Sequence, residues 1–106
     1  MREQDLVVSI LAKWGAHPRV RVARINTGAA QLHSRFVRFN PRGTADIVGL
    51  IAPTGRMLMI ECKTVDGRQS PEQWVMQRVV TEFGGLYILA RSMEDVDAVL
   101  NAVLKE

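Results

Sequence analysis

The sequence predicts a single α/β domain over residues 1–106, with a mixed sheet of about four strands flanked by helices. Three observations favour this fold class. Apolar residues recur at helical spacing in three stretches, two further apolar runs flank a short turn, and a continuous apolar segment lies between two helical patterns. A chain of 106 residues is long enough for one core of two packed layers. The expected order is helix, three strands, helix, strand, helix.

The first helix is predicted over residues 2–14, where apolar side chains form one helical stripe. These side chains are Leu6, Val7, Ile10, Leu11 and Trp14. Gly15 and Pro18 end the pattern. An alternation of Arg and Val then opens a half-exposed strand over residues 20–26.

The signal is weak between residues 26 and 42. Residues 26–30 have the composition of a loop. Residues 36–39 are expected to form a short strand before a turn at residues 40–43.

Two apolar runs, residues 46–51 and 57–63, flank a turn that contains Pro and Gly, and they predict an antiparallel hairpin. If the turn is centred on the Pro53-Thr54 bond, Asp46 lies directly opposite Glu61. Because side chains alternate along a strand, the two carboxylates then share one face at a separation of about 5 Å. A register shift of one residue would place them on opposite faces.

Two carboxylates at this separation repel each other, and partial burial makes it more costly to ionise both. A divalent cation between them relieves that cost, and hard oxygen ligands favour Mg²⁺ or Mn²⁺ over zinc. Lys63 follows on the same face as Glu61, whereas Cys62 points to the other face. The alternative is the end of a surface hairpin, where Glu61 and Lys63 pair only with their neighbours.

The second helix is predicted to begin after Ser70, because Ser70, Pro71 and Gln73 match an N-cap, a first-turn proline and a capping box. Gly84-Gly85 ends it. Its buried face is expected to contain Val75, Met76, Val79, Val80 and Phe83, and Trp74 is also expected in the core.

Two elements complete the chain. Residues 86–90 are a short apolar segment that suits a strand covered on both faces. Residues 93–104 have the spacing of a closing amphipathic helix, and Ser92 is its expected N-cap.

The composition is that of a globular protein, with 47% apolar residues, 24% charged residues and a mean hydropathy of +0.01. No apolar run approaches the roughly 20 residues that cross a bilayer, and the N-terminus does not resemble a secretory signal, so a cytoplasmic location without membrane contact is expected. One cysteine and two histidines cannot build a structural zinc site.

Basic residues are concentrated in the first part of the chain. Residues 1–45 contain eight Lys or Arg and two acidic residues. Six of these arginines have no acidic residue between them, namely Arg19, Arg21, Arg24, Arg35, Arg38 and Arg42. The planar guanidinium suits phosphate oxygens, so the cluster is consistent with nucleic-acid binding. The alternative is a solvated basic face.

Several segments together resemble a known family. In order, they are Arg24-Ile25-Asn26-Thr27-Gly28, Gly43-Thr44-Ala45-Asp46-Ile47-Val48-Gly49, Ile60-Glu61-Cys62-Lys63-Thr64, Gly67-Arg68-Gln69-Ser70-Pro71-Glu72-Gln73 and Gly84-Gly85. The Asp46…Glu61-Cys62-Lys63 pattern is similar to the signature of the PD-(D/E)XK nucleases, and the full set resembles their VRR-NUC branch. This resemblance implies a restriction endonuclease-like core and metal-dependent hydrolysis of phosphodiester bonds.

The resemblance also implies roles for individual residues. Asp46 and Glu61 would bind Mg²⁺ or Mn²⁺, with the carbonyl of Cys62 as a third ligand. Lys63 would orient the attacking water and stabilise charge on the phosphate. The number of ions, one or two, stays open.

Other residues match positions near the site in relatives. Glu3 corresponds to a glutamate beside the metal, although an acid near a helix N-terminus is favourable without any ligand. Gln73 corresponds to a glutamine that lines the site, and it also fits the capping box. The expected DNA contacts are Arg24, Asn26, Arg42 and Arg68.

The sequence thus predicts a DNA endonuclease that recognises structure rather than sequence. Stand-alone members of this branch resemble Holliday-junction resolvases, so branched DNA and a homodimer or higher homo-oligomer are the expected partners, in a bacterial or phage-infected cell. The alternatives are a flap or repair nuclease with the same site, and a non-catalytic nucleic-acid-binding module.

Overall fold

The computed structural model describes residues 2–25, 29–32, 35–38 and 43–105. The elements, in chain order, are α1 (Glu3–Trp14), β1 (Val20–Arg24), β2 (Ala29–Leu32), β3 (Arg35–Arg38), β4 (Ile47–Ile51), β5 (Arg56–Cys62), α2 (Pro71–Glu82), β6 (Leu86–Ala90) and α3 (Met93–Leu104). The three predicted helices are therefore confirmed. No helix within these residues has the length and apolar character needed to cross a membrane.

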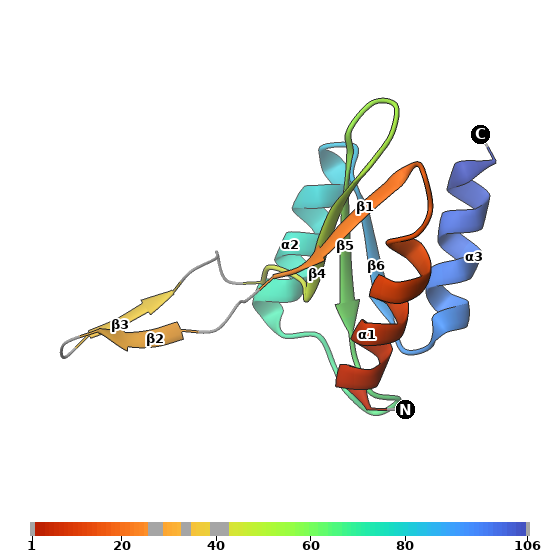
Figure 1. The fold of residues 1–106 in the computed structure, drawn as a ribbon. Helices are drawn as coiled ribbons and strands as arrows, with labels where there is room; N and C mark the ends of the chain where they lie inside the picture. Colours follow the sequence, from red (N-terminus) through yellow and green to blue (C-terminus); the bar gives the residue numbers. More distant parts are fainter. Residues whose placement is uncertain (1, 26–28, 33–34, 39–42, 106) are drawn as a thin grey trace.

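Four strands form one mixed sheet in the order β1-β4-β5-β6 (Figure 1). Strands β1, β4 and β5 are antiparallel neighbours, whereas β5 and β6 run parallel. A parallel pair requires a crossover connection, and α2 lies in that connection. The predicted α/β class, with a mixed sheet of four strands, is confirmed. The predicted order of elements is incomplete, because five strands rather than three lie between α1 and α2.

The register of the β4–β5 hairpin agrees with the prediction. Ile47 pairs with Ile60, and Ile51 pairs with Arg56. Continuing this register by one residue beyond β4 brings Asp46 opposite Glu61, as the position of the turn predicted.

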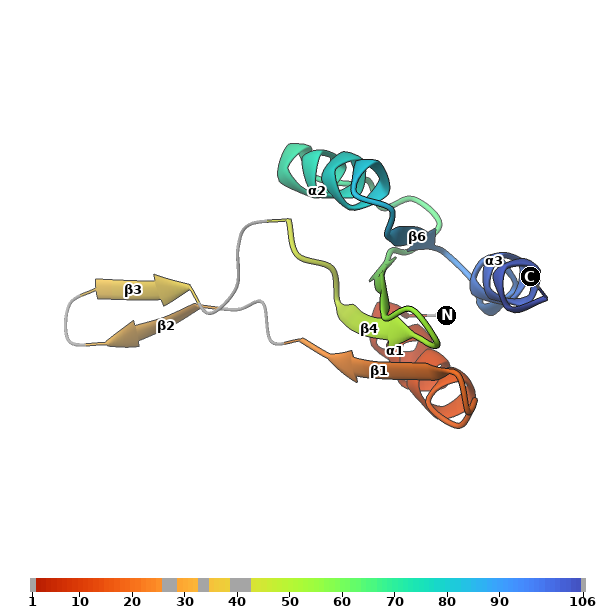
Figure 2. The ribbon, with the colours of Figure 1, turned by 90° about the horizontal axis from the view of Figure 1, so that it is seen from above.

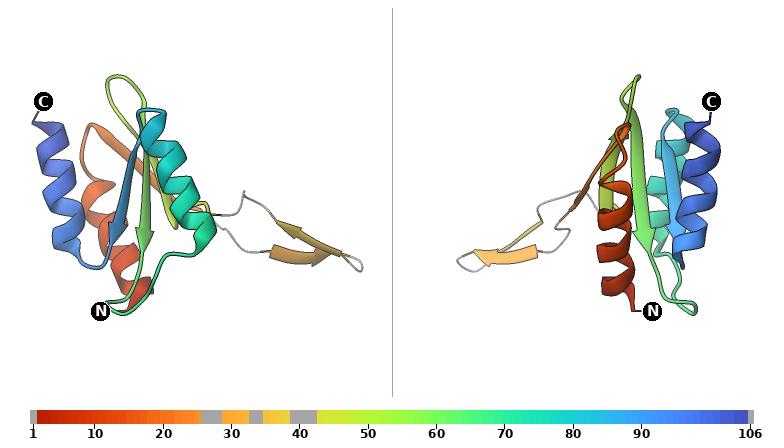
Figure 3. Two further views of the ribbon diagram at one scale, coloured as in Figure 1. Left: turned by 180° about the vertical axis from the view of Figure 1, so that it is seen from behind. Right: turned by 45° about the vertical axis from the view of Figure 1, so that its right-hand side comes forward.

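The two faces of the sheet are covered differently. Figure 2 and Figure 3 show α1 and α3 on one face and α2 on the other. The larger core lies under α1 and α3, and its buried residues are Leu6, Val7, Ile10, Trp14, Val20, Ile47, Ile51, Leu58, Ile60, Cys62, Ile88, Ala90, Val96 and Leu100. A smaller cluster lies under α2 and contains Ala45, Met59, Val80 and Tyr87.

The predicted buried face of α2 is wrong for most of its residues. Val80 is buried and Met76 is partly buried against the smaller cluster. Val75, Val79 and Phe83, which were predicted to be buried, are exposed, and Trp74 is exposed as well. The reason is that α2 packs over β5 and β6, so the flank of the helix that faces β4 has no helix beside it (Figure 2). Helical periodicity locates an apolar stripe but not how much of it the sheet covers.

The caps of α2 and α3 follow the sequence. The Ser70 side chain accepts a hydrogen bond from the Gln73 amide, and the Gln73 side chain accepts one from the Ser70 amide, which completes the predicted capping box. Ser92 caps α3 by accepting from the Asp95 amide. Gly84, at φ +90°, adopts the left-handed conformation that follows α2.

Strands β2 and β3 form a separate antiparallel hairpin that projects away from the main sheet (Figures 1 and 2). The short strand predicted at residues 36–39 corresponds to β3. The loop predicted at residues 26–30 is wrong for Ala29 and Ala30, which belong to β2. Residues 26–28 and 39–42 lie outside the described residues.

Candidate functional site

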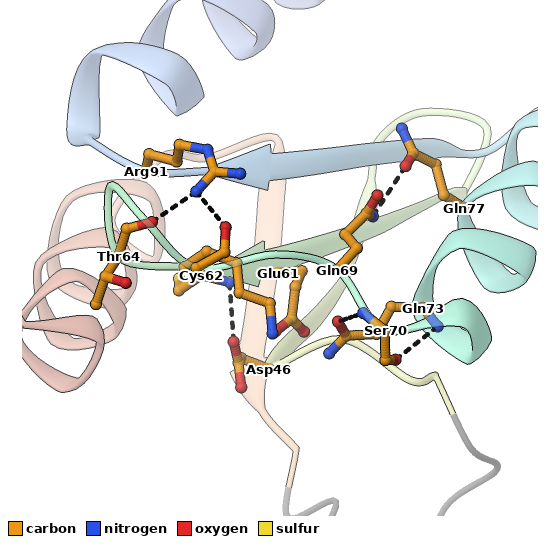
Figure 4. A network of polar contacts seen from close by, with 11 residues as sticks. Asp46, Glu61, Cys62, Thr64, Gln69, Ser70, Gln73, Gln77 and Arg91 are labelled. Carbon is orange, nitrogen blue, oxygen red and sulfur yellow. Dashed lines mark hydrogen bonds and ion pairs between the residues drawn. The ribbon is translucent and has the colours of Figure 1, made fainter.

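The predicted metal ligands lie at one end of the main sheet. Asp46 directly precedes β4. Glu61 is the next-to-last residue of β5, where it pairs with Leu89 of β6. Because β4 is antiparallel to β5 and β6 is parallel to it, the start of β4 and the ends of β5 and β6 meet at the same edge. The first turn of α2 lies close to this edge in Figure 4.

Asp46 is fixed by the backbone of both neighbouring strands. Its Oδ2 accepts a hydrogen bond of 2.8 Å from the Cys62 amide, and its carbonyl accepts one of 2.8 Å from the Ile25 amide. The Asp46 carboxylate is therefore held at the end of β5, beside Glu61 (Figure 4).

Glu61 is the buried charged residue of the described chain, with 4% of its surface exposed. Burial, and then the neighbouring charge of Asp46, raise the pKa of Glu61 to about 7. The Lys63 ammonium acts in the opposite direction and does not cancel these two effects. The protein thus folds with a carboxylate that is costly to ionise in the absence of an additional positive charge.

Lys63 completes the cluster on the same face. Its Nζ lies 3.5 Å from Oε2 of Glu61, and its side chain is mostly buried. The Lys63 amide donates to the Ala90 carbonyl at 2.9 Å, so the backbone at this residue is also held by β6. The ammonium is therefore positioned beside the carboxylate pair rather than free in solvent.

Gly43 explains how the chain reaches Asp46. This residue has φ +87°, and a Cβ atom there would lie 2.2 Å from the carbonyl oxygen of Glu72. Only glycine fits so closely against the first turn of α2. The contact fixes the segment before β4 to the N-terminus of α2 and thereby brings α2 to the carboxylates.

Gln73 contributes from that first turn. Its Oε1 accepts from the Ser70 amide at 2.9 Å, which leaves its amide nitrogen without a hydrogen-bond acceptor among the described residues. In Figure 4 the Gln73 amide points toward the Glu61 carboxylate. Both roles predicted for Gln73, in the cap and beside the site, are compatible with this position.

Arg91, which the sequence analysis did not identify, anchors the loop that follows Lys63. Its Nη1 donates to the carbonyl oxygens of Thr64, Val65 and Gly67, at 2.6, 3.2 and 2.6 Å. The guanidinium thus fixes the path of the chain directly after Lys63 (Figure 4). The sequence shows an arginine directly after the strand at residues 86–90, but its position beside Lys63 follows only from the parallel pairing of β5 and β6.

Tyr87 is a second residue that sequence reasoning missed. Its hydroxyl is buried and has no hydrogen-bond partner in the part of the chain that is described. Burial and the negative charge of Glu61 raise the pKa of Tyr87 to about 12, so the hydroxyl keeps its proton. The apolar run around Tyr87 predicts a buried strand but gives no indication that the hydroxyl lies near Glu61.

Cys62 points away from the carboxylates, as predicted, and is fully buried in the larger core. Burial, followed by the charges of Asp46 and Glu61, raises the pKa of its thiol to about 12. A thiol of this kind is not a nucleophile. The role predicted for Cys62 belongs to its carbonyl group and stays a prediction.

The remaining predicted residues are more peripheral. Glu3 is exposed at the start of α1 and pairs with no described residue, although its charge contributes to the raised pKa of Cys62. Arg24 donates through Nη2 to Oε1 of Gln4 at 2.8 Å, which ties the end of β1 to α1. Arg68 is exposed in the loop before α2. Asn26 and Arg42 lie outside the described residues.

The donor set fits a hard divalent cation. Within the described residues, no three His, Cys, Asp or Glu side chains form a metal-binding group. The two adjacent carboxylates of Asp46 and Glu61 nevertheless supply oxygen ligands, and burial together with the neighbouring Asp46 raises the pKa of Glu61 to about 7. Oxygen ligands without nitrogen or sulfur suit Mg²⁺ or Mn²⁺ better than zinc.

No family model matches the sequence of this chain, and a comparison with curated proteins finds no match either. Any functional conclusion therefore depends on the residues of the site and on the motifs in the sequence.

Proposed function

We propose that this protein is a Mg²⁺- or Mn²⁺-dependent DNA endonuclease that hydrolyses phosphodiester bonds, with a restriction endonuclease-like core of the VRR-NUC type. Branched DNA, such as a Holliday junction, is the proposed substrate, and the cytoplasm of a bacterial or phage-infected cell is the proposed location. The motifs in the sequence support the family, and the grouping of Asp46, Glu61 and Lys63 supports the chemistry.

One observation carries the proposal. A buried glutamate lies beside an aspartate, and the Lys63 ammonium next to them does not remove the cost of ionising it. A dication between the two adjacent carboxylates would offset that cost, and their oxygen atoms suit Mg²⁺ or Mn²⁺.

In the proposed reaction, a water oxygen forms a bond to phosphorus, one P–O ester bond breaks, and the departing oxygen takes up a proton. Asp46 and Glu61 would hold the ion, with the Cys62 carbonyl as a further ligand. When bound, the ion would lower the pKa of a water and polarise the phosphoryl oxygen.

The residues of the chain supply the positioning. The Lys63 ammonium, held beside Glu61 and mostly shielded from solvent, would stabilise negative charge that develops on the phosphate. Arg91 limits the movement of Lys63 by fixing the loop after it. Arg24 and Arg68, together with Asn26 and Arg42 outside the described residues, would contact DNA.

The proposal is tested with a labelled four-way junction and a linear duplex of matched sequence, each incubated with the protein and Mg²⁺, Mn²⁺ or EDTA. We expect cleavage of the junction that requires the divalent ion. A protein that binds the junction but cleaves neither DNA with either ion would contradict the enzyme proposal and favour the non-catalytic binding module.

Glu61→Ala tests the assignment of the ligand. We expect cleavage to fall by at least about 1,000-fold, while junction binding in EDTA changes little, because the substitution removes a metal ligand and no phosphate contact. Glu94→Ala, which removes an exposed carboxylate from α3 on the other side of the sheet, is the matched control and should keep full activity. Undiminished cleavage by Glu61→Ala would show that the metal assignment is wrong.

A further inference from the structure

The Tyr87 hydroxyl is a buried hydrogen-bond donor that has no acceptor among the described residues. The tyrosine is 8% exposed and packs under α2 in the smaller cluster, with Ala45, Met59 and Val80. A buried polar group without a partner costs on the order of 1–3 kcal/mol. An acceptor that reaches this hydroxyl would therefore gain a hydrogen bond that the apolar cluster does not supply.

The sheet places Tyr87 on the same face as Glu61. In the parallel pair of β5 and β6, Met59 is opposite Tyr87 and Glu61 is opposite Leu89. Residues two apart on a strand share a face, so Tyr87 and Glu61 are diagonal neighbours on the face that α2 covers. Diagonal neighbours are roughly 7–8 Å apart, a distance that aromatic and other long side chains span. The Glu61 carboxylate is thus within reach of the tyrosine side chain.

The electrostatics of Tyr87 agree with this placement. Burial, and then the charge of Glu61, raise the pKa of Tyr87 to about 12, and the charge of Asp46 contributes less. The hydroxyl therefore lies in the field of the Glu61 carboxylate. A negative charge that makes the phenol harder to deprotonate also attracts the hydroxyl proton, so it favours donation toward that charge.

A second polar side chain near the hydroxyl is Gln69. It acts to lower the pKa of Tyr87, but it does not reach hydrogen-bonding geometry. Its Nε2 donates to Oε1 of Gln77 at 2.9 Å, which ties Gln69 to α2 (Figure 4). A hydrogen bond to an ionised carboxylate is roughly twice as strong as one between neutral groups. Ionised Glu61 is therefore the better acceptor for Tyr87.

We propose that Tyr87 is a positioning residue of the candidate metal site, whose hydroxyl donates to the Glu61 carboxylate and holds it in the orientation that binds Mg²⁺ or Mn²⁺. This inference rests on the proposed function, because it takes Glu61 as a metal ligand. An ionised carboxylate offers about four lone-pair sites, so Tyr87, the ion and the Lys63 ammonium at Oε2 can use different ones. Removing such a partner of a metal ligand typically weakens metal binding about 10–100-fold.

The first test compares metal affinity with stability in Tyr87→Phe, which removes only the hydroxyl. Calorimetric titration of the full chain with Mn²⁺ should give a dissociation constant about 10-fold higher than that of the wild type. In EDTA, the variant should be at least as resistant to urea as the wild type, because it lacks the unpaired hydroxyl. A hydroxyl that only supports the fold would give the reverse, a loss of stability with unchanged metal affinity, and this result would overturn the proposal.

Two control variants separate the contact with Glu61 from other effects. Thr81→Val also removes one hydroxyl, in the last turn of α2, where Oγ1 donates to the Gln77 carbonyl at 2.7 Å. It should leave the Mn²⁺ affinity unchanged. Gln69→Ala removes the alternative acceptor and should also leave it unchanged. If Gln69→Ala weakens Mn²⁺ binding as much as Tyr87→Phe does, the hydroxyl acts through Gln69 and the direct contact with Glu61 is wrong.

A second measurement leaves the tyrosine in place. The chain contains one tyrosine, so tyrosine labelled with ¹³C at Cζ gives one signal that reports the state of the Tyr87 hydroxyl. We expect Mg²⁺, which is diamagnetic, to shift this signal saturably in the wild type and in Thr81→Val, and Glu61→Gln to abolish the shift. A signal that does not move while calorimetry records metal binding would overturn the proposal and leave the metal site standing. A wild-type protein that binds neither ion would overturn the proposed function itself, and this inference with it.

Discussion

The two faces of the main sheet differ in what they bury. The face under α1 and α3 is closed and apolar, and its helices are also joined by polar contacts, in which Trp14 Nε1 and Lys13 Nζ both donate to the Asp97 carboxylate. The face under α2 buries the Glu61 carboxylate and the Tyr87 hydroxyl, and it leaves large apolar side chains exposed, namely Leu50, Val75, Val79 and Phe83.

This difference shows how a chain of 106 residues separates stability from chemistry. Along β5, residues of one parity, such as Leu58 and Ile60, enter the closed face, while Glu61 and Lys63 lie on the other face. The closed face contributes the apolar burial that holds the sheet together. The open face, which is the face under α2, can therefore carry groups that lower stability but are able to bind an ion.

The largest expected effect comes from equal truncations on the two faces. Leu100→Ala, on the closed face, should lower the free energy of unfolding by about 3 kcal/mol, because it leaves a cavity among fully buried side chains. Leu50→Ala, on the open face, should lower it by less than about 0.5 kcal/mol, because that side chain is half exposed. Urea denaturation measures both. Similar losses for the two variants would show that both faces contribute equally to the free energy of unfolding.

Much of the closed face could be predicted from the sequence, because its signals are local. The apolar stripe of α1 and the alternation of Arg and Val in β1 are each visible within a short stretch of sequence, and both elements were predicted correctly. The register of the β4–β5 hairpin was also predictable, since the turn at Pro53-Thr54 fixes which residues are opposite each other. That register predicts Asp46 opposite Glu61, and the pairing of Ile47 with Ile60 agrees with it.

The open face was harder to predict, because its features depend on distant segments. The apolar stripe of α2 was visible, but its exposure depends on where the helix crosses the sheet. The contacts of Arg91 with the loop after Lys63 require the parallel pairing of β5 and β6, which no local pattern encodes. The β2–β3 hairpin was missed in part for another reason, since Ala29 and Ala30 have weak strand propensity.

The second prediction concerns the buried carboxylate of the open face. The pKa of Glu61 is raised from 4.5 to about 7 in the folded protein, so its contribution to stability is favourable below pH 4.5 and is lost as the pH rises through about 7. Without metal, Glu61→Gln should therefore be more stable than the wild-type protein at pH 8, by on the order of 2 kcal/mol, and similar to it at pH 4.

Thermal or urea denaturation in EDTA at the two pH values measures this effect. Added Mn²⁺ should stabilise the wild-type protein and not the variant, because only a folded protein with its ligands gains from binding. Glu94→Gln changes an exposed carboxylate and should show neither effect. If Glu61→Gln is the less stable protein at pH 8, burial of the carboxylate is not costly and the central observation at the site fails.

The smallest expected effect is on the polar contact of the closed face. Hydrogen bonds from Lys13 and Trp14 lower the pKa of Asp97 in the folded protein. The Asp97 charge therefore stabilises the fold at pH values above about 4, which is the pKa of an aspartate in an unfolded chain. That contribution is lost as the pH falls through the lower pKa of the folded state. Asp97→Asn should cost about 1 kcal/mol at pH 7, because the amide keeps an acceptor for Trp14 but loses the ion pair with Lys13. The difference between variant and wild type should disappear in urea titrations below about pH 3. Asp66→Asn, which changes an exposed aspartate in the loop after β5, should show no such pH dependence.

The two faces would then have opposite responses to pH, since rising pH strengthens the closed face through Asp97 and weakens the metal-free open face through Glu61. If Asp97→Asn lowers the free energy of unfolding equally at low pH, packing rather than the Asp97 charge holds α1 against α3. The two faces would then not differ in their response to pH through this residue.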